Sequence, residues 1–421
     1  MKQEQKAAIY CIMDNFKEAS GLAALFQANG IRTALVRGTP EKELPGGFDA
    51  VVLALRMRDI PPSEAVRKGR RALRWLQIPP QALVCIGCGS SVELLRRGNI
   101  VPLVDAVLAE VNREQAVFLP SIPEKNRQKR GVFFSQEAVE PGRLASDYIV
   151  ELEALAREQG QQEMLRLEAS SLRELSSAEL RQKIAGFAAG HVRFYVLPDC
   201  RDEDCLHKVI GLFDQQHSVF VGNRAELRDW AARYGSLEKD MPFNPHTAGR
   251  GIVLAGSCAL TVLQQTEAFR LMRGAAACYQ LEPMKLMSRQ QTIEDAWQWV
   301  ERTEGDVLIS SAEPPECVQK NHRIGQERMF GLLEKNISAL ARRAVEHGFT
   351  RIVIAGSETI DAVLAELGYR RFEAVSRAAA DVPVLMPLAA PQLRLVMKCG
   401  SQGGVDFFWR ALRQTKPGNR A

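Results

Sequence analysis

The sequence contains no run of 18 consecutive apolar residues, and this absence excludes a transmembrane helix of ordinary length. The N-terminal stretch MKQEQKAAIYCIMDNF lacks the long apolar core and the small-residue cleavage site of a signal peptide. A strong charge of one sign is missing too, since 55 Lys and Arg residues face 50 Asp and Glu residues, for a net charge of +5. That balance suits anionic small molecules but does not by itself indicate a nucleic-acid partner. The sequence therefore predicts neither membrane association nor nucleic-acid binding.

Paired cysteine motifs of the zinc-ribbon kind are also missing. The nine cysteines are scattered, and several lie inside apolar runs, as expected of reduced thiols in a cytoplasmic protein. Cys85 and Cys88 have the spacing C-x-x-C, but they belong to an apolar strand and no second pair accompanies them. The segment LPDCRDEDCLH (197–207) places acidic residues after a strand and at a helix start, where the helix dipole favours them. No metal site made by protein side chains is predicted.

Short apolar segments alternate with amphipathic helical patterns along the 421 residues. This alternation predicts an α/β fold with largely parallel sheets. The segment 233–251 is rich in Gly, Pro and Asn and has little periodicity, so it is the best linker. Two α/β domains are therefore predicted, at 1–238 and 246–421. The expected strands lie at 8–13, 32–37, 50–55, 82–87, 116–120, 193–197, 218–222, 251–256, 306–310, 351–356 and 393–400.

Two segments of the C-terminal half share the order strand, small-residue turn, helix. They are GIVLAGSCALTVLQQTEAF, with the turn Gly256-Ser257, and RIVIAGSETIDAVLAELGY, with the turn Gly356-Ser357. Unpaired N–H groups at such helix starts favour an anion, and Ser or Thr hydroxyl groups add hydrogen bonds. The alternative is that Ser257 and Ser357 only cap their helices.

A third turn follows the last apolar segment, in KCGSQGGVDFF (398–408). Lys398 ends the strand, Gly400 and Gly403 let the backbone approach a ligand, and Asp406 opens a helix. A lysine beside a glycine-rich turn is a reasonable phosphate contact. A surface turn with a solvated lysine is the alternative.

The N-terminal half offers a carboxylate and two arginines. Asp14 and Asn15 follow the first strand, at the end where α/β proteins bind ligands, and Asp14 can orient or deprotonate a hydroxyl group. The alternative role of Asp14 is an N-cap. Arg58 and Arg127 lie beside prolines, and their guanidinium groups suit carboxylates. The basic residues of 68–75 surround a helix and are typical of a solvated face.

The order of these motifs resembles that of the four-carbon acid sugar kinase family, bacterial ATP-dependent kinases of threonate, erythronate and 3-oxo-tetronate. GSCALTVLQQ is similar to the family's Gly-Ser-Cys-Ser…Thr…Gln segment, and KCGSQGGVDFF to its Lys-Ser-Gly-Asn-Phe-Gly…Asp-Phe-Phe ending. AGSETIDAVLAELG is similar to Gly-Gly-Glu-Thr-Ser-Gly-Ala-Val…Leu-Gly, and MDNFKEASGLAALFQANGIRTALV to Ala-Asp-Asp-Phe-Thr-Gly-Ala…Gly…Thr. RRGNIVP and LPSIPEKNR match Gly-Asn-Ile-Gly and Pro-Ala-Phe-Pro-x-x-x-Arg.

The resemblance implies a substrate-binding N-terminal domain, a nucleotide-binding C-terminal domain and an active site in the cleft between them. It implies ATP and Mg²⁺ as cofactors, a small sugar acid as substrate, and a role in carbohydrate metabolism; the family often self-associates, which leaves room for a homodimer. In this interpretation Asp14 orients the acceptor hydroxyl group. The substrate would be held by Asn15, Arg58, Asn99 and Arg127. The nucleotide would be held by Gly256, Ser257, Thr261, Gly356, Ser357, Glu358, Thr359, Lys398, Gly400 and Gly403.

The chain also departs from the family pattern, and two functions therefore stay open. Asn15 replaces the second N-terminal aspartate, and the family's polar substrate loop has lost its lysine and aspartate within 86–93. Ser357 and Asp361 replace two glycines, and Asp361 adds negative charge unless Mg²⁺ binds it. The first hypothesis is an ATP-dependent kinase of a small hydroxylated carboxylic acid. The second is a catalytically inactive relative that binds a metabolite or a protein partner.

Overall fold

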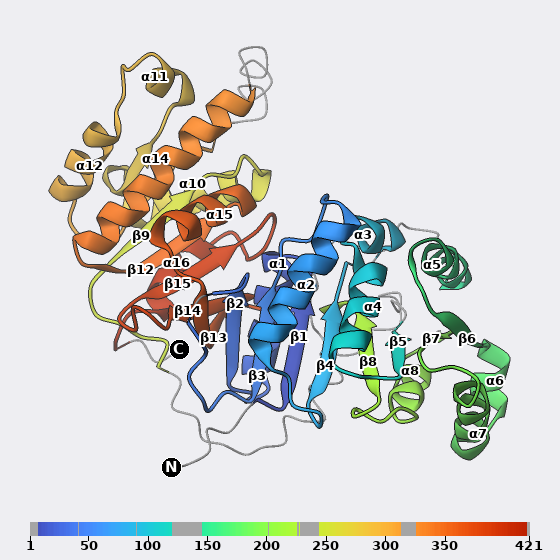
Figure 1. Cartoon of the computed structure of the whole chain (residues 1–421). Helices are drawn as coiled ribbons and strands as arrows, with labels where there is room; N and C mark the ends of the chain where they lie inside the picture. Colours follow the sequence, from blue (N-terminus) through green and yellow to red (C-terminus); the bar gives the residue numbers. More distant parts are fainter. Residues whose placement is uncertain are drawn as a thin grey trace. The chain divides into compact units, whose positions relative to one another are not determined.

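The structure is a computed structural model of the whole chain, and it describes residues 7–40, 42–89, 91–119, 145–200, 202–224, 227, 244–312 and 326–418. The chain divides into two compact units, Met1–Asp240 (the N-unit) and Met241–Ala421 (the C-unit). Each unit is built of strands covered by helices (Figure 1). The predicted α/β class with largely parallel sheets is confirmed in both units.

The strands of the N-unit lie in the order β2-β3-β1-β4-β8-β5-β7-β6, and every neighbouring pair is parallel. The strands are β1 (Ile9–Met13), β2 (Thr33–Arg37), β3 (Ala50–Ala54), β4 (Leu83–Gly87), β5 (Gln115–Phe118), β6 (Glu163–Leu167), β7 (Phe194–Pro198) and β8 (Ser218–Gly222). The helices are α1 (Phe16–Ala28), α2 (Pro62–Leu76), α3 (Val92–Arg97), α4 (Ile100–Glu110), α5 (Ala145–Gln159), α6 (Ala169–Glu174), α7 (Ser177–Ala188) and α8 (Glu203–Ile210).

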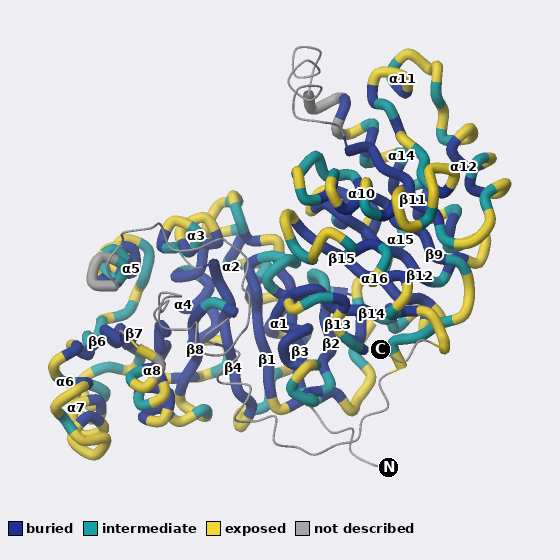
Figure 2. The backbone as a smooth tube through the Cα atoms, turned by 180° about the vertical axis from the view of Figure 1, so that it is seen from behind, coloured by how far each residue is buried: buried dark blue, intermediate teal, exposed yellow. Residues whose placement is uncertain are grey.

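The strands of the N-unit form its core because their residues are apolar on both faces. Strands β1, β3 and β4 are buried at every position, as expected for a parallel sheet covered by helices on both sides. Helices α2 and α4 lie over one face, and α1 lies over the other (Figures 1 and 2). Figure 2 shows the result, with buried strands inside and exposed helix surfaces outside.

The C-unit has the strand order β10-β11-β9-β12-β15-β14-β13, which is parallel from β10 to β15 and antiparallel from β15 to β13. The strands are β9 (Arg250–Ala255), β10 (Cys278–Gln280), β11 (Val307–Ser310), β12 (Phe349–Ala355), β13 (Arg371–Ala379), β14 (Val382–Pro387) and β15 (Arg394–Lys398). The helices are α10 (Leu260–Arg273), the 3₁₀ turn η3 (Ala275–Ala277), α11 (Pro283–Met287), α12 (Ile293–Arg302), α14 (Gln326–Glu346), α15 (Ser357–Leu367) and α16 (Phe407–Gln414).

Alternation along the strands of the C-unit divides its core between two faces. Val253 and Ala255 of β9 pack with Phe269 of α10 and Phe408 of α16 in one apolar cluster. The intervening residues of the strands face the other way, where α14 and α15 pack against β12 and against each other. One face of the sheet is therefore covered by α10 and α16 and the other by α14 and α15.

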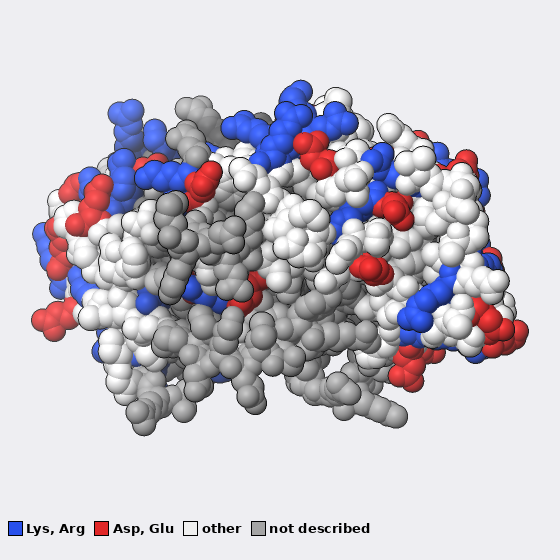
Figure 3. Space-filling model, turned by 60° about the horizontal axis from the view of Figure 1, so that its bottom comes forward, with Lys and Arg blue, Asp and Glu red and all other residues white. Residues whose placement is uncertain are grey.

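Charged side chains of both signs are mixed on the surface. Figure 3 shows one face of the molecule, on which Lys and Arg side chains are interspersed with Asp and Glu. On the basic helix α2, Lys68 pairs with Glu64 at 3.0 Å and Arg74 pairs with Glu110 at 3.3 Å. These exposed ion pairs agree with the prediction that 68–75 is a solvated face. Among the helices that the structure describes, none combines the length and the apolar character that crossing a membrane requires.

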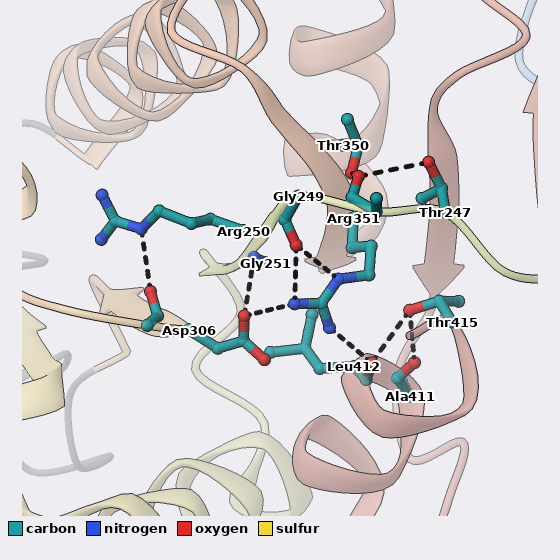
Figure 4. Close-up of polar contacts among 12 residues, drawn as sticks. Thr247, Gly249, Arg250, Gly251, Asp306, Thr350, Arg351, Ala411, Leu412 and Thr415 are labelled. Atoms are coloured by element: carbon teal, nitrogen blue, oxygen red, sulfur yellow. Dashed lines mark hydrogen bonds and ion pairs between the residues drawn. The ribbon is translucent and has the colours of Figure 1, made fainter. Parts of the chain in front are cut away.

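A buried ion pair joins the amino ends of the C-unit strands (Figure 4). The guanidinium group of Arg351, on β12, donates to Asp306 Oδ1 at 2.5 Å, to the Gly249 carbonyl and to the Leu412 carbonyl. Asp306 Oδ1 also accepts from the Gly251 N–H at 2.8 Å. Arg351 is 2 % exposed. The Asp306 carboxylate and the two backbone carbonyls supply hydrogen-bond acceptors for its buried guanidinium group, and the carboxylate also balances its charge. The amino edge of the sheet is thus fixed by side-chain contacts among β9, β12, α16 and Asp306 before β11.

Candidate functional site

The N-unit has its topological switch point at β1. The chain passes from β1 through α1 to β2, returns to β3, and crosses by α2 to β4 on the far side of β1. Connections of opposite direction leave a crevice at the carboxyl ends of the strands, and ligands of open α/β sheets bind there. Asp14 follows the last residue of β1 and therefore lies at this end of the sheet.

Asp14 is fully buried and is held by two neighbours. Arg58 Nε donates to Asp14 Oδ2 at 2.7 Å, and Asn15 Nδ2 donates to Asp14 Oδ1 at 2.5 Å. Burial raises the pKa of the Asp14 carboxyl group, and the charge of Arg58 opposes that rise without cancelling it. A carboxylate with a raised pKa is a stronger base, which suits a group that accepts a proton from a hydroxyl group.

Asn15, and not Asp14, is the N-cap of α1. The Asn15 side chain accepts from the Glu18 N–H at 3.0 Å, so its oxygen caps the helix while its nitrogen binds Asp14. Asn15 thus joins the helix start to the carboxylate. The predicted contact of Asn15 with substrate stays a prediction.

Asn99 fixes the loop that carries Arg58. Its Nδ2 donates to the Met57 carbonyl at 2.9 Å and to the Ile60 carbonyl at 3.0 Å, and the residue is 4 % exposed. Asn99 adopts a left-handed conformation (φ 54°), which asparagine tolerates better than most residues. The Asn99 amide therefore supports the loop that carries Arg58. Arg127, the other arginine predicted to bind substrate, lies outside the described residues.

Gly98 is a site residue that the sequence did not single out. A Cβ atom at Gly98 would lie 3.1 Å from Asp14 Oδ2, so glycine keeps space beside the carboxylate. The only sequence signal was the motif Gly-Asn in RRGNIVP, from which Asn99 alone was selected.

The C-unit has its switch point between β9 and β12. From β9 the chain passes to β10 and back to β11, then crosses by α14 to β12. The Gly256 turn follows β9, the Gly356 turn follows β12, and Lys398 ends the next strand, β15. The Gly256 N–H donates to the Ala355 carbonyl at 3.0 Å, and the Gly356 N–H donates to the Lys398 carbonyl at 3.1 Å. The three predicted phosphate turns are therefore side by side.

The Gly256 turn and the Gly356 turn contact each other so closely that neither glycine position has room for a side chain. A Cβ atom at Gly256 would lie 2.1 Å from Thr359 Oγ1. Gly356 has φ +122°, and a Cβ atom there would lie 2.9 Å from Thr359 Oγ1 and 3.3 Å from the Ser257 nitrogen. Glycine is required at 356 for both reasons.

Neither Ser257 nor Ser357 caps its helix in the way the alternative interpretation requires. The N-cap of α15 is Gly356, Ser357 is already the first helical residue, and no side chain caps the helix. The N-cap of α10 is Ala259, again without a side-chain cap, and Ser257 Oγ accepts from the Ala259 N–H at 3.3 Å. Ser357 and Glu358 are exposed, while Thr359 is buried. The first N–H groups of α10 and α15 are therefore not taken by caps and can bind an anion.

Thr261 lies in the first turn of α10, directly after Leu260. Glu358 and Asp361 lie near the start of α15. Burial and the charges of these two carboxylates raise the pKa of Glu334 on α14. The start of α15 thus combines helix N–H groups with negative side chains. Within the described ranges, no three His, Cys, Asp or Glu side chains are placed to hold a metal ion by themselves.

Lys398 does not lie on the surface. Its Nζ donates to Gln265 Oε1 at 2.8 Å and to the Gly400 carbonyl at 2.9 Å, and the side chain is fully buried. Burial lowers the pKa of Lys398 to about 8. Gly400 (φ +49°) and Gly403 (φ +80°) shape the following turn. The sequence suggested Lys398, Gly400 and Gly403, whereas Gln265, the last residue of the segment GSCALTVLQQ, received no predicted role.

The described part of the segment 197–207 contains two thiols in contact. Cys205 Sγ lies 2.9 Å from Cys200 Sγ, and the Asp202 carboxylate accepts from the Cys205 N–H at 2.8 Å as the N-cap of α8. The hydrogen bond with Cys205 and burial raise the pKa of the Cys200 thiol. An N-cap explains the acidic character of this segment, as the sequence suggested.

The chain matches two family models. A sugar-binding N-terminal domain matches residues 9–225, and a nucleotide-binding C-terminal domain matches residues 252–408. A protein of Pseudomonas fluorescens named 3-oxo-tetronate kinase is 29 % identical over 97 % of each chain. A protein of Methylobacterium radiotolerans with the same name is 30 % identical over 96 % of this chain and 98 % of its own.

Two solved structures share the fold. A Salmonella typhimurium protein superposes with a TM-score of 0.79 at 25 % identity, over 97 % of this chain and 99 % of its own. A Haemophilus influenzae protein superposes with a TM-score of 0.76 at 24 % identity, over 96 % and 98 %. The matched models span most of the apolar strands, Asp14 and the three glycine turns described above. This chain therefore belongs to the four-carbon acid sugar kinase family, with a sugar-binding N-terminal domain and a nucleotide-binding C-terminal domain.

Proposed function

We propose that the chain is an ATP-dependent kinase that phosphorylates a hydroxyl group of a four-carbon sugar acid or a close relative of one. The proposal rests on what lies at the topological switch point of each unit. In the N-unit it is the buried carboxylate of Asp14, and in the C-unit it is the pair of contacting glycine turns at Gly256 and Gly356. The relatives named 3-oxo-tetronate kinase suggest the acid and the phosphoryl donor. The N-unit would bind the sugar acid and the C-unit the nucleotide, in keeping with the two matched domain models.

In the N-unit, Asp14 accepts the proton of the attacking hydroxyl group. Its raised pKa makes it a better base, and the hydrogen bonds from Arg58 and Asn15 fix its orientation. Arg58, with its side chain 30 % exposed, also presents positive charge to the carboxylate of a sugar acid. Asn99 supports this arrangement by donating to two backbone carbonyls of the loop that carries Arg58.

In the C-unit, the N–H groups at the starts of α10 and α15 receive phosphate oxygens. The glycines at 256 and 356 allow the close approach, and the Ser257 and Thr359 side chains line the same turns. Phosphoryl transfer needs mainly positioning and charge stabilisation, so backbone donors of this kind are suitable.

A bound Mg²⁺ ion would allow nucleotide phosphates to bind close to the carboxylates of Glu358 and Asp361. Magnesium in kinases is held by one or two carboxylates together with phosphates, and the described residues offer this number at the start of α15. When bound, the ion would neutralise phosphate charge. The like-charge repulsion that adds to burial in raising the pKa of Glu334 would then be reduced.

Replacement of Asp14 by Asn tests the catalytic part. The variant keeps the size of the side chain but loses the base, so kcat falls by about 10²- to 10⁴-fold, measured as ADP release with four-carbon sugar acids. Asp105→Asn is the matched control, because burial also raises the pKa of Asp105, which binds Tyr195 outside the predicted site. Equal turnover in Asp14→Asn and the unchanged protein would rule out Asp14 as the base.

A second function is supported by the carboxylates at the start of α15. If Glu358 and Asp361 repel nucleotide phosphates, the chain is an inactive relative that binds a metabolite or a partner. Calorimetric titration with ATP separates the two. Micromolar binding that requires Mg²⁺ supports the kinase, whereas no heat at millimolar ATP on folded protein supports the inactive relative. A homodimer is tested separately by light scattering during size-exclusion chromatography.

A further inference from the structure

Among the residues that the structure describes, no charged group pairs with Lys398, a buried cation at the proposed nucleotide site. Its two hydrogen-bond acceptors, Gln265 Oε1 and the Gly400 carbonyl, are both neutral. The ring of Phe408 lies 5.8 Å from its ammonium group. A lysine enclosed in this way is poorly placed to reach a ligand in solvent, and its hydrogen bonds point to the turn itself.

Gln265 connects the ammonium group to that turn. The side chain is fully buried on α10, and its Nε2 lies 3.1 Å, 3.3 Å and 2.9 Å from the carbonyl oxygens of residues 402, 403 and 404. Its Oε1 accepts from Lys398. The two ends of one amide thus bind a residue at the end of β15 and the far side of the turn that follows.

Only an amide satisfies both ends. An ammonium group can only donate, and backbone carbonyls can only accept. A carboxylate at 265 would bind Lys398 but would face the three carbonyls without a donor. An apolar side chain of similar length would bind neither end.

The turn depends on this support because its own backbone is unusual. Gly400 and Gly403 both have positive φ, and a Cβ atom at Gly403 would lie 2.4 Å from the Phe407 ring. The Gln402 side chain adds a second internal brace, since its Oε1 accepts from the Cys399 N–H at 2.7 Å and its Nε2 donates to the Asp381 carbonyl at 3.3 Å.

We propose that Gln265 is a positioning residue of the nucleotide site, and that Lys398 acts through Gln265 by fixing residues 400–404 rather than by contacting phosphate. The proposal rests on the proposed function, because the turn matters for turnover only if nucleotide binds beside it. It replaces the expectation that Lys398 is itself a phosphate contact.

Two substitutions at Gln265 separate the proposal from direct contact. Gln265→Glu keeps the bond to Lys398 and loses the three carbonyl contacts, whereas Gln265→Met loses both. In each variant the KM for ATP rises about tenfold or more, while kcat and the KM for the sugar acid change little. Gln264→Met is the matched control, because Gln264 is the exposed neighbour on the same helix, and it leaves all three constants unchanged.

Lys398→Met gives the decisive comparison. If Lys398 acts through Gln265, its loss raises the KM for ATP by about as much as Gln265→Met does, and the double variant is no worse than either single one. A KM for ATP that is normal in Gln265→Glu but raised a hundredfold in Lys398→Met would overturn the proposal, because the ammonium group would then contact the phosphate directly.

Hydrogen exchange of the unliganded protein makes the test independent of the kinase assignment. Amides of residues 399–404 exchange faster in Gln265→Glu and Gln265→Met than in the unchanged protein and Gln264→Met. If the unchanged protein binds no ATP, the proposed function fails, and the exchange rates still decide whether Gln265 holds the turn. Unchanged exchange in Gln265→Met, with an unfolding temperature showing a folded variant, contradicts the proposal.

Discussion

Three buried cations lie in the described part of the C-unit, and two of them, Arg351 and Lys398, lie at opposite edges of its sheet in different surroundings. The third, Arg394, begins β15 and donates to backbone carbonyls. Arg351 at the amino edge binds the Asp306 carboxylate and two backbone carbonyls (Figure 4). Within the described part of the chain, Lys398 at the carboxyl edge donates to neutral oxygens of Gln265 and Gly400. The first charge is compensated inside the protein, while the second is left with a lowered pKa.

This difference separates two ways in which the fold holds a buried cation. A compensated guanidinium fixes three segments and has no charge to offer a ligand. An ammonium group that is buried with neutral acceptors costs the fold stability, and its hydrogen bonds to Gln265 and Gly400 offset part of that cost. The carboxyl edge, where ligands of α/β sheets bind, is the edge at which Lys398 and Gln265 meet the glycine-rich turn.

Breaking the compensated pair should have the largest effect. Asp306→Ala leaves the Arg351 guanidinium buried without its carboxylate and removes the acceptor of the Gly251 N–H. The free energy of unfolding should fall by about 3–5 kcal/mol, as measured by urea denaturation. A loss below 1 kcal/mol would show that the carbonyls of Gly249 and Leu412 suffice for Arg351.

Titration of Lys398 should produce the next largest effect. Burial lowers its pKa from the ordinary 10.5 to about 8, so between these values the unfolded chain holds a proton that the folded chain has released. The unfolding free energy of the unchanged protein therefore gains a contribution that rises with pH in this window, in total about 3 kcal/mol at most. Lys398→Met lacks this contribution, so its stability relative to the unchanged protein should decline from pH 8 to pH 10.5. A difference that is constant with pH would mean that Lys398 has its ordinary pKa.

The glycine turn at the carboxyl edge should show a smaller effect on stability. Gly356→Ala forces a left-handed backbone on alanine and places a Cβ atom against Thr359 and Ser257, which costs about 1–3 kcal/mol. The matched control is Gly331→Ala, inside helix α14 with open space around it, where alanine should stabilise by about 0.5–1 kcal/mol. Thermal unfolding of both variants tests the contrast. If both variants changed the unfolding temperature by the same amount in the same direction, the Gly356 turn would have to adjust its backbone to accept alanine without strain.

The smallest effect should come from an exposed ion pair in the same unit. Arg342 lies 3.1 Å from Glu366, and their side chains are 55 % and 32 % exposed. Glu366→Ala should change the unfolding free energy by less than about 1 kcal/mol, because water and salt screen the pair. A loss comparable to that in Asp306→Ala would remove the distinction between buried and exposed pairs.

Much of the fold and part of the candidate site followed from local sequence. Apolar segments of strand length predicted β1, β9 and β12, because a strand buried on both faces needs apolar residues at every position. Gly356 could be singled out because only glycine combines a positive φ with close contacts. Asp14 was found because it directly follows a buried strand, at the edge where ligands bind.

Other features depended on contacts that local patterns do not encode. The role of Asn15 as the N-cap, with Asp14 buried beside it, required side-chain geometry. Arg58 was chosen as a ligand of a substrate carboxylate, but the structure shows that its first partner is Asp14. The sequence alone gave no reason to join these two residues, which lie 44 positions apart.

The sequence by itself determined the class of fold, the positions of the glycine turns and the end of the sheet at which polar residues gather. Hydrophobic periodicity and backbone preference act over a few neighbouring residues, so both can be recognised in the amino-acid sequence. The tertiary structure decided which buried polar groups meet. Lys398 and Gln265 are 133 residues apart, and Arg351 and Asp306 are 45 apart. A buried charge or amide takes whichever partner the packed strands and helices bring within hydrogen-bond distance, and only the folded chain sets that distance.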